Sequence, residues 1–199
     1  MSKARIEAFS DAVIAGAITL LALDLHVPDP AGPGSLAHRL GEQWPNYAAY
    51  VVSFLTIGII WINHHAMLQR LVSGDHAILV LNLLLLLTIG VLPFSTALMA
   101  EYLDASHGQN LAAVIYGGSF LLMSLAFFAM QRHLLVARPE LVAPEIGPAE
   151  RNAIMRRNMV GLVPYVVATA VAPLSSYLVL AICGAVGLYY ALPTTTSNA

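Results

Sequence analysis

The stretch AILVLNLLLLLTIGVLPFSTALMA, residues 77–100, contains no charged residue. A helix crosses the hydrocarbon core of a bilayer with roughly 20 apolar residues, so this stretch is long enough to span it. Two more stretches without Asp, Glu, Lys or Arg follow, Leu111–Met130 and Met159–Ala199. Charged residues make up 10% of the chain and hydrophobic residues 58%, whereas an ordinary soluble domain has about 25% charged residues. So few charges cannot cover a water-soluble surface, and the composition predicts an integral membrane protein.

Apolar runs separated by turn-forming residues predict six helices, near 6–26, 46–70, 76–103, 109–135, 150–171 and 175–192. The stretch 28–34 is so rich in Pro and Gly that it must be a loop outside the hydrocarbon. Turn residues also interrupt the chain at 106–109 and 139–148. Ala172-Pro173-Leu174-Ser175-Ser176 divides the last apolar stretch, and without this break only five spans would fit. The predicted fold is an all-α membrane protein in which residues 1–199 form a single six-helix transmembrane domain.

Basic residues are concentrated on one side of the six predicted spans, and such an excess marks the cytoplasmic side. That side carries Lys3, Arg5, Arg70, Arg132, Arg138, Arg151, Arg156 and Arg157. The opposite side carries Arg39 and the carboxylates Asp24, Asp29, Glu42, Glu101 and Asp104. We therefore expect a multi-pass protein of the cell membrane with both termini in the cytoplasm. The acidic outer face would mildly concentrate cations.

Several other classes of protein are disfavoured. The net charge of −2 and the lack of Lys and Arg clusters argue against a nucleic-acid partner. Cys183 is the single cysteine, so there is no disulfide framework. The sequence has no Gly-rich phosphate loop and no nucleophile motif, so we expect neither an enzyme nor a cofactor. The basic start of the chain resembles a secretory signal peptide, but Glu7, Asp11 and Asp24 do not fit one.

The first predicted helix carries a stripe of small and apolar residues beyond its charged start. Gly16, Thr19, Leu20 and Leu23 recur at helical spacing and share one face. Small residues at this spacing commonly mark close packing of helices in membranes. A pore lining would have the same period, so the spacing alone leaves both interpretations open.

Polar side chains also occur within the second and third predicted helices, where they are costly in lipid and therefore informative. They are Trp61, Asn63, His64, His65, Gln69, His76 and Asn82. Adjacent residues on a helix point about 100° apart, so His64 and His65 cannot easily bind one metal ion. Hydrogen bonds between helices are the favoured interpretation, and a proton relay is the alternative.

The segment Arg5-Ile6-Glu7-Ala8-Phe9-Ser10-Asp11 resembles the R-x-x-x-F-S-D signature of the transmembrane protein 175 potassium channels. The segment 12–28, Trp61 with His64 and His65, and Asn82 with Pro93-Phe94 are also similar to the first three helices of that family. Specific motifs carry the resemblance over the first half of the chain, and topology alone carries it over the second half.

The resemblance implies a homotetramer whose central, cation-selective pore is lined by the first helix of each subunit. The pore-lining residues would be Gly16, Thr19, Leu20 and Leu23. The resemblance also implies that the signature residues Arg5, Phe9, Ser10 and Asp11 belong to a hydrogen-bonded network in which Trp61, His64 and Asn82 are the best-placed partners. Buried polar groups in lipid need such partners.

Gly16 departs from the family pattern, which usually has a bulky Ile or Leu at the innermost constriction. A hydrophobic constriction gates by dewetting, so the narrow point should move outward to Leu20 or Leu23. Closer approach of the helices at Gly16, or weaker selectivity than in relatives, are the alternatives.

We therefore expect a potassium channel that conducts passively, with K+ as the permeant ion and no other metal or cofactor. Partial dehydration at Leu20 and Leu23, with Thr19 replacing some of the water, would rank K+ against Na+, because the chain has no Thr-Val-Gly-Tyr-Gly loop. A proton-coupled secondary transporter using His64, His65 and Asp11 is the main alternative, although the paired repeats of such proteins are not evident. A non-conducting membrane scaffold is a third possibility.

Overall fold

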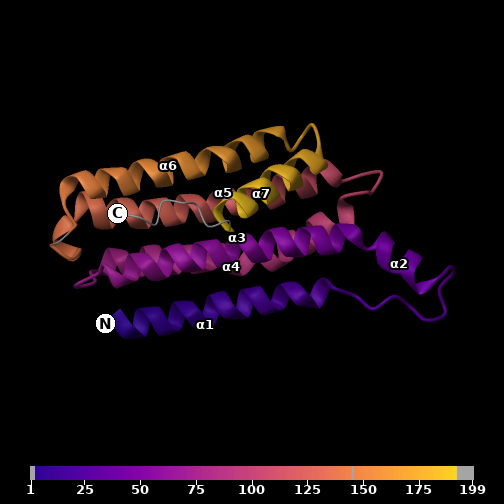
Figure 1. The fold of residues 1–199 in the computed structure, drawn as a ribbon, viewed down its shortest axis with the longest axis horizontal. Helices are drawn as coiled ribbons and strands as arrows, with labels where there is room; N and C mark the ends of the chain where they lie inside the picture. The colour runs from indigo at the N-terminus through magenta and orange to yellow at the C-terminus, as the bar shows by residue number, and fades with distance from the viewer. Residues whose placement is uncertain (1–2, 145, 192–199) are drawn as a thin grey trace.

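The computed structural model describes residues 3–144 and 146–191, which fold into a bundle of α-helices. The helices are α1 (Lys3–Leu21), α2 (Leu36–Glu42), α3 (Trp44–Gln69), α4 (His76–Tyr102), α5 (Gln109–Arg132), α6 (Pro148–Val171) and α7 (Ser176–Ala191). The long helices lie side by side along one axis, with α1 along one edge of the bundle and α6 along the opposite edge (Figure 1).

The helices agree with the predicted ranges to within a few residues, with three differences. α1 is followed by a 3-10 turn at Ala22–Asp24 instead of continuing to residue 26. The short helix α2 was not predicted; it begins after Ser35, whose hydroxyl accepts a hydrogen bond from His38 N at 3.2 Å, as an N-cap does. α5 leads into a π-helical turn at His133–Ala137. The predicted end of the last helix, residue 192, lies outside the described residues.

Four of these helices are long and apolar enough to span a membrane, with candidate spans at Lys3–Asp24, Trp44–Gln69, His76–Tyr102 and Gln109–Ala137. The other two long helices fall short for different reasons. α6 begins with Glu150, Arg151, Arg156 and Arg157 in its first half, and α7 has only 16 residues. The chain is thus an all-helical membrane protein with at least four candidate spans.

Helix α4 lies among three other helices and contacts α1, α3 and α5. Its buried residues, Ile78, Asn82, Leu85, Leu86, Ile89, Leu92, Ser95, Thr96, Met99 and Ala100, recur every three or four positions, as expected for a helix packed along a continuous stripe. Buried hydroxyl groups join three helices within this core. Ser53 Oγ of α3 lies 2.8 Å from Thr96 Oγ1 of α4 and 3.1 Å from the Tyr116 hydroxyl of α5. These hydrogen bonds satisfy hydroxyl groups that could not form hydrogen bonds with lipid tails.

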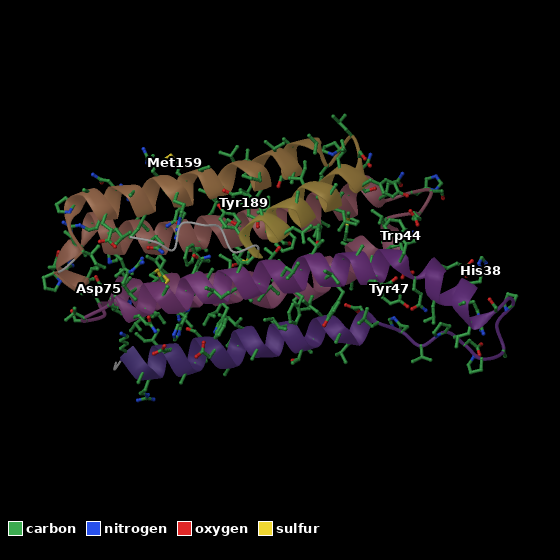
Figure 2. The ribbon with its side chains drawn as sticks, in the orientation of Figure 1. His38, Trp44, Tyr47, Asp75, Met159 and Tyr189 are labelled. Carbon is green, nitrogen blue, oxygen red and sulfur yellow. The ribbon has the colours of Figure 1, made fainter. Side chains whose placement is uncertain are left out.

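The two connections at the end of the bundle where α1 begins are tied together. Val72 N donates to Leu141 O and Ala143 N donates to Arg70 O, both at 2.9 Å. Next to them, Asp75 caps α4 by accepting from Ile78 N at 2.9 Å, and it lies at this end of the bundle in Figure 2. Its other carboxylate oxygen is 2.9 Å from His133 Nε2 and 3.7 Å from an Arg138 guanidinium nitrogen. Asp75 therefore connects the start of α4 to the segment after α5.

Replacing Asp75 by Ala should lower the free energy of unfolding by about 1 kcal/mol, because the N-cap bond to α4 is lost. The hydrogen bond from Ile78 N, aided by His133 and Arg138, outweighs partial burial and holds the pKa of Asp75 below its ordinary value of 3.8. A depressed carboxyl pKa contributes stability that is present above pH 3.8 and is lost as the pH falls further. Thermal unfolding in detergent should therefore show the wild-type advantage at pH 7 and its decrease below pH 3.8.

Asp75→Asn is the matched control, because Asn caps helices about as well as Asp but does not ionise. This variant should keep most of the stability at pH 7 and should not show the acid-dependent loss. Equal unfolding of the Ala variant and the wild type at pH 7 would contradict the capping role.

Candidate pore helix and its polar network

Helix α1 has one buried face and one uncovered face. The buried residues are Ile6, Ser10, Ile14, Ala17 and Leu21. They recur every three or four positions and face α3 and α4, which are the helices that α1 contacts. At the far end, Leu21 is 0% exposed and Leu23 is 70% exposed. Because α1 lies at the edge of the bundle (Figure 1), no other described helix covers the second face.

The four residues predicted to line a pore lie on this uncovered side. Thr19, Leu20 and Leu23 are exposed, and Leu20 has 51% of its surface accessible. A Cβ atom added at Gly16 would meet no other atom within 4 Å. Thr19 Oγ1 donates a hydrogen bond to Gly16 O at 2.8 Å. Since the hydroxyl proton is used in that bond, the lone pairs of the Thr19 oxygen remain available to an external ligand.

Three buried side chains from three helices form a hydrogen-bonded chain on the other face of α1. Asn82 Nδ2 of α4 donates to Ser10 Oγ of α1 at 3.0 Å, and Ser10 Oγ donates to Ile6 O at 2.8 Å. Asn82 Oδ1 lies 2.8 Å from His64 Nε2 of α3. An amide oxygen only accepts, so the proton of His64 resides on Nε2. Ser10, His64 and Asn82 are each at most 3% exposed. Their buried hydrogen bonds connect α1 to both of its neighbouring helices, α3 and α4.

A second set of polar contacts runs along the seam between α1 and α3. Lys3 Nζ donates to Gln69 O at 2.9 Å, and Trp61 Nε1 donates to Asp11 Oδ1 at 2.8 Å. Between them, Glu7 Oε1 lies 3.0 Å from His65 Nδ1 but outside hydrogen-bonding geometry. The rings of Trp61 and His65 stack with their centroids 6.0 Å apart.

The three pairs follow one register. Each step of four residues forward on α1, from 3 to 7 to 11, matches a step of four residues back on α3, from 69 to 65 to 61. Residues four apart lie on one helix face, so two antiparallel helices form a ladder. Lys3, Glu7, His65 and Gln69 were not among the predicted network residues, although the four-residue spacing on both helices could have indicated them.

The structure does not bring Arg5 and Phe9 into this network. Both are exposed, with Phe9 at 50%, and within residues 3–144 and 146–191 Arg5 forms no ion pair and no side-chain hydrogen bond. Arg5 does not pair with Asp11 either, because six residues of helix turn the two side chains about 120° apart. Arg5 and Phe9 instead continue the uncovered stripe of Gly16 and Leu23 toward the start of α1.

Comparison with known proteins identifies the chain. Residues 5–93 match the family model described as "Endosomal/lysosomal potassium channel TMEM175". A potassium channel of Streptomyces collinus is 44% identical over 186 residues, which cover 94% of this chain and 90% of the relative. The chain belongs to the TMEM175 family.

Two further comparisons extend this similarity along the chain. A potassium channel of Chamaesiphon minutus is 38% identical over 191 residues, covering 94% of this chain and 93% of the relative. The crystal structure of a lysosomal potassium-selective channel TMEM175 homolog from Chamaesiphon minutus superimposes with a TM-score of 0.83 at 35% identity and covers 98% of both chains. The TMEM175 fold therefore extends through α5, α6 and α7, beyond the residues that the family model matches.

The segment of this chain that the TMEM175 family model matches, residues 5–93, contains all residues of both polar clusters except Lys3. Within the described residues, no group of three or more His, Cys, Asp or Glu side chains could hold a metal ion. His64 and His65 point to different partners, Asn82 and Glu7. In this TMEM175 chain, bonds between helices are formed by the side chains of Ser10, Asp11, Trp61, His64 and Asn82.

Proposed function

We propose that this chain is a potassium channel that conducts passively through a pore on the axis of a homotetramer, lined by α1 of each subunit. The observation that carries the proposal is the uncovered face of α1 at the edge of the bundle, in a chain whose relatives are named potassium channels. A helix with one apolar face against its own subunit and a second open face is ready to pack against copies of itself.

The proposed pore residues are Gly16, Thr19, Leu20 and Leu23. Leu20 and Leu23 would form apolar rings at which a hydrated cation loses part of its water. The Thr19 hydroxyl oxygen, whose proton is already bonded to Gly16 O, would face the ion with its lone pairs. Partial dehydration then favours K+ over Na+, since the smaller ion holds its water more strongly. K+ is the permeant species, and the mechanism needs no cofactor.

We further propose that the network described above holds α1 in place while the ion passes. The network comprises Ser10, His64 and Asn82, together with Asp11 and Trp61. In the tetramer, Arg5 and Phe9 would reach neighbouring subunits, because they continue the open stripe. The contacts on the buried face then hold α1 in position, and its uncovered face lines the pore.

All six long helices are proposed to cross the cell membrane, with residues 1–199 as a single domain and both termini in the cytoplasm. α6 has 24 residues and, at 1.5 Å per residue, is about 36 Å long, which exceeds a hydrocarbon core of about 30 Å. Arg151, Arg156 and Arg157 fall in its first ten residues, where long basic side chains reach the headgroups. Lys3, Arg70, Arg132 and Arg138 lie at the same end of the bundle.

Recording in a planar bilayer with the purified protein tests the proposal. Discrete single-channel currents carried by K+ without any other driving solute are expected, together with a mass of four subunits in detergent or lipid. A monomeric protein, or transport that requires a proton gradient, would reject the channel and favour the proton-coupled transporter.

Gly16→Ile should reduce the K+ current without unfolding the subunit, because a Cβ atom at this position meets no other atom of the subunit and the larger side chain would add an apolar ring to the pore. Gly117→Ile is the contrasting change. A Cβ atom there would lie 3.3 Å from Thr169 Oγ1 and 3.4 Å from Val179 Cγ1, so overpacking should destabilise the fold by about 1–3 kcal/mol. Current and thermal unfolding measured together check both outcomes, and an unchanged current in Gly16→Ile would exclude Gly16 from the pore.

A further inference from the structure

A cavity of about 830 Å³ lies between α3, α5, α6 and α7. It exists because α7 is short. α7 packs between α3 and α6, but its 16 residues end well before the end of the bundle where α6, with 24 residues, begins (Figure 1). Tyr189 and Tyr190, near the C-terminal end of α7, line one side of the cavity.

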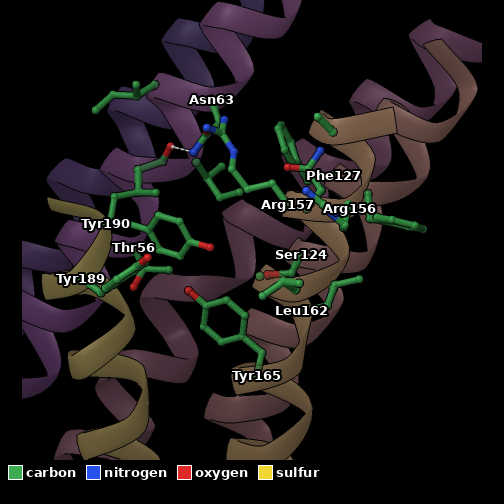
Figure 3. A pocket seen from close by; sticks show the side chains of 18 residues that line it. Thr56, Asn63, Ser124, Phe127, Arg156, Arg157, Leu162, Tyr165, Tyr189 and Tyr190 are labelled. Atoms are coloured by element: carbon green, nitrogen blue, oxygen red, sulfur yellow. Dashed lines mark hydrogen bonds between the residues drawn. The ribbon is translucent and has the colours of Figure 1, made fainter. Parts of the chain in front are cut away.

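The cavity has an apolar wall and a basic end. Ile59 of α3, Phe127 of α5 and Leu162 of α6 belong to the apolar wall. Arg156 and Arg157 of α6 supply two guanidinium groups, and Figure 3 shows the Arg157 side chain extending across the cavity toward α3. The described lining contains no acidic residue. An occupant must therefore be anionic at one end and apolar at the other.

The hydrogen-bond donors at the basic end of the cavity remain available to a ligand, as far as the described residues show. Neither Arg156 nor Arg157 forms an ion pair with a described carboxylate. Asn158, which also lines the cavity, has a buried amide nitrogen without a hydrogen-bond partner among the described residues. Phosphate oxygens accept several such bonds at once, and guanidinium groups bind them bidentately.

The position of the cavity distinguishes a lipid from a soluble anion. Its basic end lies toward the end of the bundle where Lys3, Arg70 and Arg132 are found, and its apolar wall continues toward the middle of the helices. Tyrosines such as Tyr189 and Tyr190 are typical of the membrane interface. Basic pockets between membrane helices on the cytoplasmic side are suited to anionic headgroups.

We propose that this cavity binds one anionic phospholipid, with its phosphate on Arg156 and Arg157 and an acyl chain along Phe127 and Leu162. Helices α6 and α7, which line the site together with α3 and α5, lie on the side of the bundle away from α1 (Figure 1). The site is independent of the pore residues, so a failure of the lipid site leaves the proposed channel untouched, and the reverse also holds.

Native mass spectrometry of the purified full-length protein tests the site. The protein is titrated with phosphatidylglycerol, with phosphatidylcholine, or with inorganic phosphate. We expect retention of phosphatidylglycerol over phosphatidylcholine and no displacement by inorganic phosphate. The Arg156→Gln/Arg157→Gln double variant should bind phosphatidylglycerol about thirtyfold more weakly, since each of the two basic groups near the headgroups contributes about 1 kcal/mol.

Two more variants make the result specific. Arg132→Gln removes one charge at the same end of the bundle from a residue that does not line the cavity, and it should bind like the wild type. Gly161→Leu keeps both arginines but fills the cavity, because a Cβ atom there would already lie 3.2 Å from the Tyr190 hydroxyl; this variant should also lose the lipid. Equal retention of both lipids by the wild type, displacement by inorganic phosphate, or full binding by Gly161→Leu in a protein of normal mass would overturn the proposal.

Discussion

Leu23→Ala and Leu20→Ala are expected to raise the single-channel K+ current. Both side chains lie on the uncovered face of α1, where Leu23 is 70% and Leu20 51% exposed. If four copies of each form apolar rings around the pore, shortening them widens the constriction and makes it easier to wet. A barrier lower by about 1 kcal/mol corresponds to a current about fivefold larger. Selectivity for K+ over Na+ should fall at the same time, because the ion keeps more of its water.

Leu178→Ala provides a matched control for these two changes. Leu178 lies on α7 and is 50% exposed, so the substitution removes the same atoms from a side chain about as accessible as that of Leu20. Its current should equal that of the wild type. Unchanged conductance in both the Leu20 and Leu23 variants would remove α1 from the pore, whereas a similar rise in Leu178→Ala would point to a general loosening of the bundle.

Asn82→Ala is expected to destabilise the protein and abolish most of the current. Asn82 is bonded to Ser10 on one side and His64 on the other, and all three residues are buried. Removing the amide leaves the buried imidazole of His64 without its partner, at about 1–3 kcal/mol, whereas the Ser10 hydroxyl keeps its bond to Ile6 O. Because the bonds of Asn82 hold α1 against α3 and α4, the proposed pore helix should lose its fixed position. Thermal unfolding in detergent and bilayer recording measure the two effects.

Asn63→Ala is the control for Asn82→Ala. Asn63 is on α3, one residue before His64, and its amide donates to Ile59 O of its own helix, at 2.8 Å. The control should unfold within about 1 kcal/mol of the wild type and should conduct normally. Equal stability of the two variants would mean that the bonds of Asn82 do not hold the helices together.

The amino-acid sequence was sufficient to locate the long helices, because charge-free stretches bounded by Pro and Gly are typical of membrane helices in a chain with 10% charged residues. The family resemblance, together with the rule that polar groups inside a membrane must find partners, selected Ser10, His64 and Asn82, which the structure joins. The role of these residues in conduction stays a prediction.

Contacts between helices could not be obtained in the same way. The register that pairs Glu7 with His65 and Asp11 with Trp61 depends on how far α3 slides along α1, and that distance is set by packing of the whole bundle. The same limit explains why Arg5 and Phe9, which the resemblance placed in the polar network, lie outside it among the described residues. α2 was missed because seven residues give too short a pattern. The cavity forms because α7 is shorter than α6. The difference in length leaves an open space only once the helices are packed side by side, so the sequence alone does not reveal it.

The backbone hydrogen bonds between residues 70–72 and 141–143 have a mechanical consequence. They connect the segment that follows α5 to the loop that precedes α4. Asp75 strengthens this connection, because its carboxylate lies next to His133 and Arg138. A force on residues 139–143 would therefore be borne at the base of α4, the helix that carries Asn82 and packs against α1. Through the contacts between α4 and α1, such a force would also act on the proposed pore helix.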